Sequence, residues 1–370
     1  TQDKLIIGTG SFNNGFRTPS SIFYLNSLFY LPLIKYFSFH FGAILILGIS
    51  NLILIFKLKD DFKKKEYDFI FVLTLLSFLF INIFFYRISE HGTDRSAQIL
   101  IFILFIELLS LYRNDIFLKS FFSKIFILLG LIISLKVFYV LYLLILIPIL
   151  FKFKDYNFLK IFKSFFINLY FYLFILIGFF LIAVNIFNSG CVLYPISFTC
   201  FNNFEWSLFY EAELMKNWYE LWSKAGASPT YRDADPDNYI KGFNWLQNWI
   251  EFYFFNKVLD FIAGVIFLLF IIFFVFYTKN KKNTYFNKRV WWIYSLIIIL
   301  FIEWFYNHPS LRYGGYVLVA LIMFIPFSVY VSKFDLNERL KKKVILLMVF
   351  SLLIFTGRNI DRIYKESLKY

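Results

Sequence analysis

Long apolar stretches alternate with short polar loops throughout this sequence of 370 residues. About nine of them reach roughly twenty residues, the length at which a helix crosses the hydrocarbon core of a bilayer. We expect spans near residues 39–56, 68–86, 97–111, 165–186, 257–277, 290–306, 313–331 and 344–355. The pattern therefore predicts an all-α fold, a polytopic transmembrane helix bundle of about nine spans with a re-entrant half-helix hairpin and one large extracytoplasmic loop.

Lysine is concentrated in alternate loops. The clearest of these loops are KLKDDFKKKE, TKNKKNTYFNKR and SKFDLNERLKKK. Because cytoplasmic loops carry an excess of Lys and Arg, these segments mark the cytoplasmic side and the remaining loops mark the other side. We predict a multi-pass protein of the bacterial inner membrane whose second face is periplasmic.

One apolar stretch, residues 125–151, does not fit a single span. It is too long for one comfortable helix and too short for two, it carries Lys136 at its centre, and basic loops flank it on both sides. Two half-length helices that return to the side they left satisfy both the length and the charge. Non-helical backbone at that depth must line a wet cavity or be buried in protein.

The large loop, residues 187–256, carries more acids than bases, which supports its assignment to the periplasmic side. Cys191 and Cys200 are the only cysteines, and we expect them to form a disulfide in an oxidising compartment. Trp218 and Trp222 lie one helical turn apart and predict an amphipathic helix in the membrane interface, or an aromatic platform for a sugar or lipid headgroup. No linker divides the chain, so residues 1–370 form a single integral membrane domain.

The composition excludes an ordinary soluble domain. The chain is 60% hydrophobic with a mean hydropathy of +0.66, whereas soluble domains are roughly 45–50% apolar. The net charge of +14 would suit nucleic acid, but most of it lies in loops that the positive-inside rule makes cytoplasmic. We therefore expect membrane lipid as a partner and no nucleic acid.

The sequence begins at Thr1, without an initiator Met. The order of the spans requires either an upstream span or a start on the outer side. We therefore expect that residues are missing from the N-terminus.

The sharpest polar cluster is RISEHGTDRSAQIL, which contains Arg87, Glu90, His91, Asp94 and Arg95. A carboxylate at the mouth of a cavity can deprotonate an acceptor hydroxyl, and arginines can bind a phosphate leaving group. The alternative is a solvated loop whose opposite charges pair with one another.

A second short outer loop, HPSLRYGGY, places Arg312 beside His308 and Tyr313. Arginine at a membrane mouth suits a phosphate clamp, and interfacial anchoring is its alternative. Lys136 is a third candidate, because an amine at depth usually faces a cavity or snorkels. Glu303 lies near the outer end of its span and could simply reach the interface. No motif typical of a metal site or of nucleotide binding occurs.

Three segments together resemble bacterial GT-C-type membrane glycosyltransferases, which take sugars from polyprenyl-phosphate donors. The segments are SEHGTDRSAQILIFILFIELLSLY, LLGLIISLKVFYVLYLLILIPILF and KLIIGTGSFNNGFRTPSSIFYLNSLFYLP. The last of these, with SGCVLYP and HPSLRYGGY, is also similar to polytopic proteins of O-antigen and capsule clusters. The resemblance touches most of residues 1–150 and scattered points beyond.

The resemblance implies that Arg312, Arg95, Lys136 and Arg17 hold the phosphate, with His91 and Tyr313 also binding substrate, and that Asp94 or Glu90 assists the acceptor hydroxyl. The family's usual catalytic acid lies in the first outer loop, but here Asp3 is the only acid before Asp60. If the chain lacks its natural N-terminus, we expect the principal base to lie in the missing residues. A divalent metal ion held with those acids stays open, and no other cofactor is indicated.

These observations favour transfer of a glycosyl group from a polyprenyl-phosphate-linked sugar to a glycan or lipid acceptor on the periplasmic side. One alternative is a polymerase of O-antigen or capsule repeat units, which the large loop would suit. Another is a transporter or flippase of polysaccharide precursors. Spans that are nearly free of charge count against that third class, which needs polar residues within the membrane.

Overall fold

The computed structural model describes residues 6–12, 17–29, 32–33, 40–88, 92–111, 118–152, 163–227, 233–280, 290–334 and 339–368. Within these residues the fold is all-α and contains no β-strand. The long helices are α3 (Phe41–Lys64), α4 (Phe69–Phe84), α5 (Gly92–Ser110), α6 (Leu118–Leu135), α9 (Leu169–Ser189), α10 (Phe209–Lys224), α13 (Leu259–Phe276), α14 (Val290–Asn307), α15 (Gly315–Val331) and α16 (Arg339–Ser367). The short ones are η1 (Thr9–Ser11), α2 (Ser21–Ser27), η3 (Val137–Ile145), α7 (Leu146–Lys152), η4 (Ser197–Thr199), α11 (Pro236–Tyr239), α12 (Leu246–Trp249), the π-helical η5 (Ile250–Val258) and η6 (Leu311–Tyr313).

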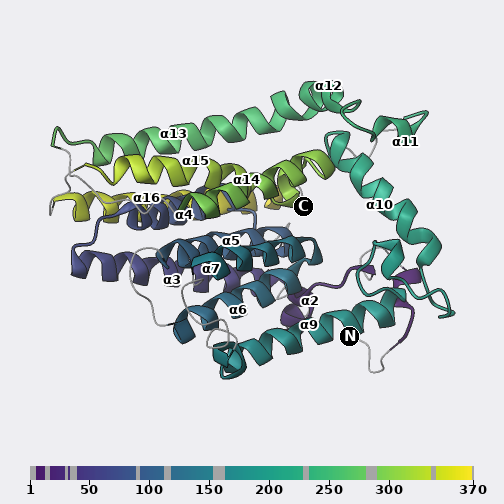
Figure 1. The fold of residues 1–370 in the computed structure, drawn as a ribbon. Coiled ribbons are helices and arrows are strands. Elements are labelled where there is room, and N and C mark those ends of the chain that lie inside the picture. Colours follow the sequence, from purple (N-terminus) through teal and green to yellow (C-terminus); the bar gives the residue numbers. More distant parts are fainter. Residues whose placement is uncertain are drawn as a thin grey trace.

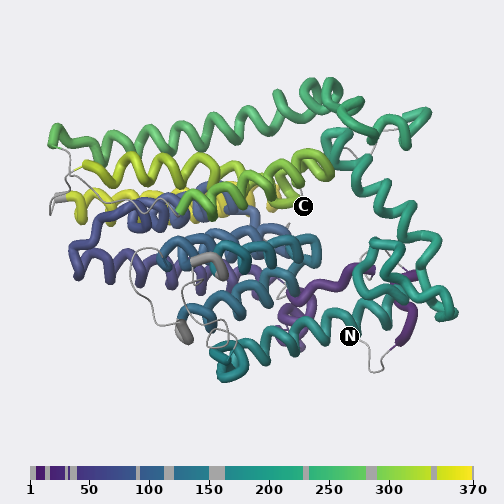
Figure 2. The backbone as a smooth tube through the Cα atoms, in the orientation of Figure 1, coloured from purple at the N-terminus to yellow at the C-terminus, as the bar shows by residue number. Residues whose placement is uncertain are grey.

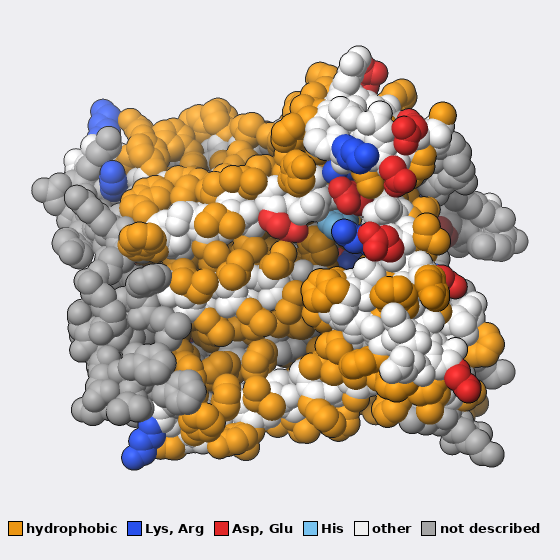
Figure 3. Space-filling model, turned by 45° about the vertical axis from the view of Figure 1, so that its right-hand side comes forward, with side chains coloured by type: hydrophobic (Ala, Val, Ile, Leu, Met, Phe, Trp, Pro, Cys, Tyr) orange, Lys and Arg blue, Asp and Glu red, His pale blue; other side chains and the backbone are white. Residues whose placement is uncertain are grey.

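The long helices other than α10 run side by side and form a bundle with two distinct ends (Figure 1). We call one the loop end, because the segment between α9 and α12 lies across it (Figure 2). We call the other the lysine end, because α3 finishes there with Lys63 and Lys64 in its last turn. In space-filling view a broad apolar band separates Lys and Arg at the left margin from most of the acids in view at the right (Figure 3).

Five helices are long and apolar enough to cross a membrane. They are Phe41–Lys64, Leu169–Ser189, Leu246–Phe276, Val290–Asn307 and Leu340–Ser367. Shorter apolar helices include Phe69–Phe84, Phe121–Leu135, Val137–Ile149 and Gly315–Val331. The all-α expectation is confirmed, and the helices are those of an integral membrane protein.

Burial sorts the helices into central and peripheral ones. α4 and α5 are apolar on all sides, and nearly every residue from Ile70 to Asn82 and from Ser96 to Ser110 is buried. A helix that is apolar all round can be covered by its neighbours on every face, and α5 indeed contacts α3, α4, α6 and α15. By contrast, only 6% of the apolar window of α9 is buried. The position of α5 matters because it carries an acid near each end.

Several helices extend beyond the apolar stretches that predicted them. α3 continues past residue 56 to Lys64, and α16 runs from Arg339 to Ser367 rather than over residues 344–355. Backbone hydrogen bonding does not stop where hydropathy falls, so polar residues extend a helix into water. Asp68, in contrast, begins α4 where expected, because its side chain accepts hydrogen bonds from the backbone N–H groups of Ile70 and Phe71.

The stretch around Lys136 is divided as its charge and length predicted, but its arms are longer. α6 starts at Leu118, before the predicted residue 125, and ends at Leu135. η3 and α7 then continue from Val137 to Lys152. With rises of about 2.0 Å per residue in a 3₁₀ helix and about 1.5 Å in an α-helix, neither arm is a half-length helix.

The segment across the loop end contains both features predicted for it. Cys191 and Cys200 form a disulfide. α10 is a regular helix that crosses the end of the bundle, from the neighbourhood of α9 to that of α12 (Figure 1). Lys224, in its last turn, is fully buried and binds Glu220 and the Ile240 carbonyl, both at 2.6 Å.

Candidate functional site

A buried carboxylate holds two cations at the loop end. Asp94 lies in the first turn of α5, ahead of the apolar part of that helix, and its side chain is 1% exposed. Its Oδ1 accepts a hydrogen bond from Lys136 Nζ, and its Oδ2 accepts one from Arg312 Nε. We call these three residues the Asp94 cluster. The helix N-terminus adds a favourable interaction with the ionised carboxylate.

The break between α6 and η3 positions Lys136. Its backbone is extended, with φ −156° and ψ 116°, between two helical segments. Its ammonium lies 4.3 Å from the centre of the Tyr313 ring, an arrangement stabilised by the ring quadrupole. Lys136 is thereby bound both to α5 and to the loop that carries Arg312.

Arg312 is positioned by hydrogen bonds to the backbone of its loop. Four side chains make them. Trp249 Nε1 donates to the Pro309 carbonyl (2.8 Å), and Trp304 Nε1 donates to the Ser310 carbonyl (2.9 Å). Gln98 Nε2 donates to the Arg312 carbonyl (2.8 Å), and Tyr253 Oη accepts a hydrogen bond from the Leu311 N–H (2.9 Å). Buried backbone groups need such partners, because an unpaired one is costly. The loop is therefore fixed from α5, α12, η5 and α14 together.

Two glycines permit the turn from this loop into α15. Gly314 has a φ of 112°, in the region that residues with a Cβ rarely adopt. A Cβ on Gly315 would lie 2.2 Å from Cζ2 of Trp304. The GG of HPSLRYGGY thus serves backbone conformation and close packing beside the cluster.

The two cations of the Asp94 cluster are reachable, while the carboxylate is not. The side chain of Lys136 is 23% exposed and that of Arg312 is 43% exposed. Burial acts to raise the pKa of Asp94, but Lys136 and Arg312 outweigh it, and the pKa is lowered overall. Asp94 is therefore ionised at neutral pH.

His308 borders the same cluster as a neutral base. Its ring contacts Phe138 and Tyr313 edge-on. Burial, followed by the charges of Lys224, Lys136 and Lys216, lowers the pKa of His308 to about 4. Its Nδ1 is buried without a hydrogen-bond partner among the described residues.

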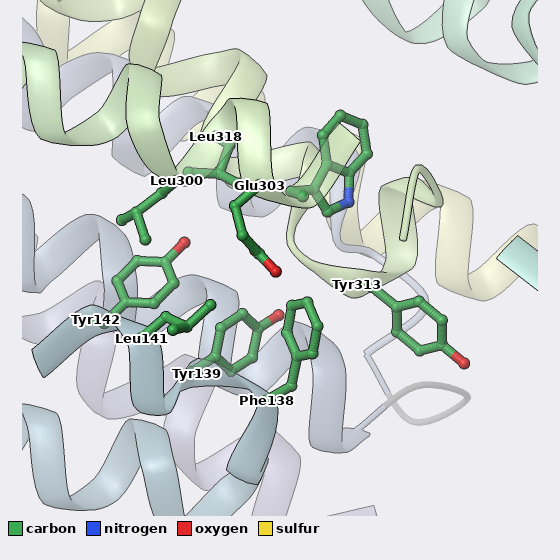
Figure 4. A pocket seen from close by; sticks show the side chains of 9 residues that line it. Phe138, Tyr139, Leu141, Tyr142, Leu300, Glu303, Tyr313 and Leu318 are labelled. Carbon is green, nitrogen blue, oxygen red and sulfur yellow. The ribbon is translucent and has the colours of Figure 1, made fainter. Parts of the chain in front are cut away.

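A small pocket, with an interior of about 10 Å³, which is roughly the room that one water molecule needs, lies between η3 and α14 and borders the same loop. It is lined by Phe138, Tyr139, Leu141, Tyr142, Leu300, Glu303, Trp304, Tyr313 and Leu318. Figure 4 shows the Glu303 side chain extending into the pocket, with the Tyr139 and Tyr142 rings on one side of it and Tyr313 on the other. Tyr313 borders both the pocket and Lys136, so the pocket and the Asp94 cluster are neighbours.

Two predicted phosphate-binding residues bind elsewhere. Arg95 donates to the Arg87 carbonyl, and its guanidinium lies over the Phe85 ring. Arg17 forms an ion pair of 2.5 Å with Glu211 on α10 and donates to the Gly10 carbonyl at 2.9 Å. The structure thus brings together Asp94, Lys136, Arg312 and Tyr313, but not Arg17 or Arg95.

The remaining predicted residues, Glu90 and His91, lie outside the described residues. For metals, no group of three or more His, Cys, Asp or Glu side chains in the described part of the chain could hold an ion. The Asp94 cluster offers a single carboxylate, already bound on both oxygens.

Sequence reasoning gave too little weight to Glu303. The sequence did offer a signal, because an acid inside an apolar stretch is by default a functional candidate. Tyr139 and Tyr142 carried no such signal, since tyrosine is common throughout this chain. Only the structure shows that they converge on Glu303.

Together these features define an all-α membrane protein with a buried charge cluster and an adjoining pocket at one end of its bundle. The family model described as "Domain of unknown function (DUF8201)" matches residues 4–319. This match spans most of the chain and includes the Asp94 cluster, so the protein belongs to that family. No curated protein and no solved structure matches the chain.

Proposed function

We propose that this protein transfers a glycosyl group from a polyprenyl-phosphate-linked donor to a glycan or lipid acceptor on the periplasmic side of the bacterial inner membrane. The observation that carries the proposal is the pair of partly exposed cations, Lys136 and Arg312, bound to one buried carboxylate beside an apolar bundle. A lipid phosphate needs such cations next to such an apolar surface.

The cation pair suits a phosphate leaving group. When the bond between the sugar C1 and the phosphate oxygen breaks, negative charge develops on the phosphate, and fixed cations stabilise it. Asp94 binds Arg312 through Nε, which leaves the two terminal nitrogens of the guanidinium for phosphate oxygens. Arginine commonly binds phosphate in this two-pronged way.

Asp94 is better suited to positioning than to proton transfer. Both of its oxygens bind cations, and its pKa is lowered, whereas an effective general base has a pKa near the working pH. We therefore assign Asp94 the role of holding Lys136 and Arg312 in place, instead of the role of base that the sequence suggested.

The membrane orientation belongs to the same proposal. The lysine end suits the cytoplasm by the positive-inside rule. The Cys191–Cys200 disulfide, at the opposite end, suits an oxidising compartment such as the periplasm. The donor's lipid tail would lie against the apolar sides of the bundle, with its phosphate entering at the loop end.

The test is the surface-glycan profile of a strain that lacks the full-length gene, complemented with variants. We expect the deletion to give a sugar-deficient glycan with accumulating donor lipid, and Arg312→Met to fail in complementation. The matched control is Arg358→Met. Arg358 also lies at the loop end, where it covers the Tyr86 ring and binds the Ile83 carbonyl outside the cluster.

The possible outcomes separate the rival functions. Loss of the long ladder, with core plus a single repeat remaining, would mean a polymerase of repeat units instead. An unchanged profile in the deletion strain would overturn the proposal. Full complementation by Arg312→Met would show that Arg312 is not needed to bind the donor phosphate.

A further inference from the structure

The acids near the loop end differ in whether they bind a cation. Asp94, Glu211 and Glu220 each bind at least one basic side chain. Glu303, near the end of α14, forms no ion pair with any residue that the structure describes. One of its oxygens accepts a hydrogen bond of 3.2 Å from the neutral amide of Asn307, and the other accepts none from the described residues. A carboxylate oxygen without a bound cation is free to accept a proton.

The end of α14 holds Glu303 beside the Asp94 cluster. Trp304, the next residue, donates a hydrogen bond of 2.9 Å to the Ser310 carbonyl, which fixes this helix end against the loop HPSLRYGGY. Tyr313 lines the same pocket as Glu303. The centre of its ring also lies 4.3 Å from the ammonium of Lys136. The acid and the cations are therefore neighbours of the same residue, Tyr313.

The surroundings of Glu303 leave the carboxylate accessible from one side. The residue is partly exposed, and its side chain extends into the pocket (Figure 4). The pocket interior of about 10 Å³ has room for roughly one water molecule, and its walls include the rings of Phe138, Tyr139 and Trp304. A substrate would therefore meet the carboxylate from its exposed side, while bulk water is kept from the inner side. Exclusion of water suppresses hydrolysis of an activated sugar.

We propose that Glu303 is the general base of the transfer reaction and that its free oxygen accepts the proton of the acceptor hydroxyl. The assignment rests on the proposed function, and it gives the reaction the base that Asp94 does not supply. In a direct displacement at C1 of the donor sugar, the acceptor oxygen approaches from the side opposite the leaving phosphate. The base and the phosphate-binding cations must then be close to each other without being paired, as Glu303 is with respect to Lys136 and Arg312.

The proposed step balances in protons and electron pairs. The acceptor O–H bond breaks, its proton passes to the free oxygen of Glu303, and the electron pair left on the acceptor oxygen forms the new bond to C1. The bond between C1 and the phosphate oxygen breaks, and its electron pair stays on the phosphate beside Lys136 and Arg312. Glu303 later releases the proton to solvent from its exposed side.

The experiment measures transfer by the purified full chain in lipid nanodiscs. The donor probe is the donor lipid extracted from the deletion strain, and the acceptor probe is the sugar-deficient glycan of that strain. We expect Glu303→Gln to lower the rate at least about 100-fold, the size of effect that a general base contributes. Glu303→Asp keeps a carboxylate and should be at least about tenfold faster than Glu303→Gln.

A second acceptor separates proton transfer from a structural role. Azide is an anionic nucleophile that needs no base, and its transfer product is a glycosyl azide, which mass spectrometry detects. We expect Glu303→Gln to form glycosyl azide within about threefold of the wild-type rate, although it loses transfer to the glycan. A variant that had lost the fold or the donor site would lose both reactions.

The matched control is Glu251→Gln. Glu251, in η5, also accepts a hydrogen bond from an amide one helical turn away, that of Gln247 at 3.1 Å, but it does not line the pocket. This variant should keep both reactions within about threefold of the wild type.

Three results would overturn the assignment. One is transfer to the glycan by Glu303→Gln at the wild-type rate. Another is an equal loss of both reactions in that variant, which would mean a structural role. The third is that His308→Phe, instead of Glu303→Gln, loses transfer to the glycan and keeps transfer to azide, because His308 would then be the base.

Undecaprenyl phosphate, a lipid phosphate without a sugar, distinguishes failure of this assignment from failure of the proposed function. We expect it to raise the midpoint of thermal unfolding in the wild type and in Glu303→Gln, and not in Arg312→Met. Transfer that depends on Arg312 but not on Glu303 would overturn the base alone. Absence of both transfer and this shift in the wild type would overturn the proposed function together with the base.

Discussion

The two ends of α5 carry the same ionic arrangement in different surroundings. At the loop end, Asp94 binds Lys136 and Arg312. At the lysine end, Glu107 binds Lys57 of α3 at 2.9 Å and Lys124 of α6 at 2.8 Å, and we call these three residues the Glu107 cluster. In each, one carboxylate on α5 binds two cations.

The difference between the clusters lies in what brings their cations together. α3, α5 and α6 pack side by side, so the Glu107 cluster forms wherever those helices meet. Arg312 instead comes from a loop more than two hundred residues from Asp94, fixed by hydrogen bonds from Trp249, Trp304 and Gln98. The Asp94 cluster also adjoins the pocket beside Glu303. We infer that the Glu107 cluster stabilises helix packing, whereas the Asp94 cluster serves a ligand.

The largest difference should appear in activity. Asp94→Asn keeps the size of the side chain but no longer fixes both cations, and we expect it to lower glycosyl transfer at least about 100-fold while membrane insertion stays intact. Glu107→Gln is the matched change at the other end of the same helix, and it should stay within about threefold of the wild type. The measurement is glycan complementation at equal membrane abundance. Full activity of Asp94→Asn would show that glycosyl transfer does not depend on the Asp94 cluster.

The next largest difference between the two clusters is expected in their contribution to the free energy of unfolding. Arg312→Met leaves the buried Asp94 with one cation, and we expect a loss of about 2–3 kcal/mol in the free energy of unfolding. Lys124 is 56% exposed, and Lys124→Met should cost less than about 1 kcal/mol. Unfolding in mixed micelles gives both values. Equal costs would mean that the Asp94 cluster is no better shielded from solvent than the Glu107 cluster.

Much of this contrast could be predicted from the sequence. The single fixed charge of HPSLRYGGY and the lone lysine in an apolar stretch directed attention to Arg312 and Lys136, because a charge at membrane depth is costly and needs a reason. The short spacing of Cys191 and Cys200 predicted their disulfide, and the pattern around Trp218 predicted α10. These predictions depended on local rules.

The remainder depended on tertiary contacts. Arg17 and Arg95 are as conspicuous in the sequence as Arg312, and only packing shows that they bind Glu211 and the Arg87 carbonyl. The C-terminal ends of α3 and α16 were predicted too early in the sequence. Hydropathy indicates which residues suit the membrane, and it does not indicate where a helix ends. Tyr139 and Tyr142 could not be distinguished from the other tyrosines, because their position beside Glu303 is a property of the fold.

Acid should weaken the loop end more than the lysine end. The pKa of His308 is lowered from 6.5 to about 4, so the unfolded chain takes up a proton at a higher pH than the folded one. Stability is therefore retained above pH 6.5 and declines as the pH falls from there toward 4. At pH 5 we expect a cost of about 1–2 kcal/mol relative to pH 7.

The variant His308→Phe tests this pH dependence. It keeps a ring against Phe138 and Tyr313 and removes the titrating group, so its unfolding midpoint should fall less between pH 7 and pH 5. A slope identical to that of the wild type would show that the pKa of His308 is the same in the folded and the unfolded protein.

The smallest expected effect compares one hydroxyl beside each cluster. Tyr253→Phe removes the acceptor of the Leu311 N–H, and Ser110→Ala removes the acceptor of Lys57 Nζ at 2.8 Å. Each should cost about 1 kcal/mol of stability, the usual value of one hydrogen bond. Undecaprenyl phosphate, which carries the lipid and the phosphate without a sugar, should raise the midpoint of thermal unfolding by binding at Arg312. Only Tyr253→Phe should also weaken this shift in the midpoint, because it loosens the loop that carries Arg312. If Ser110→Ala weakens that shift equally, the two ends of α5 are coupled through the helix, and the Glu107 cluster shares in the function of the site.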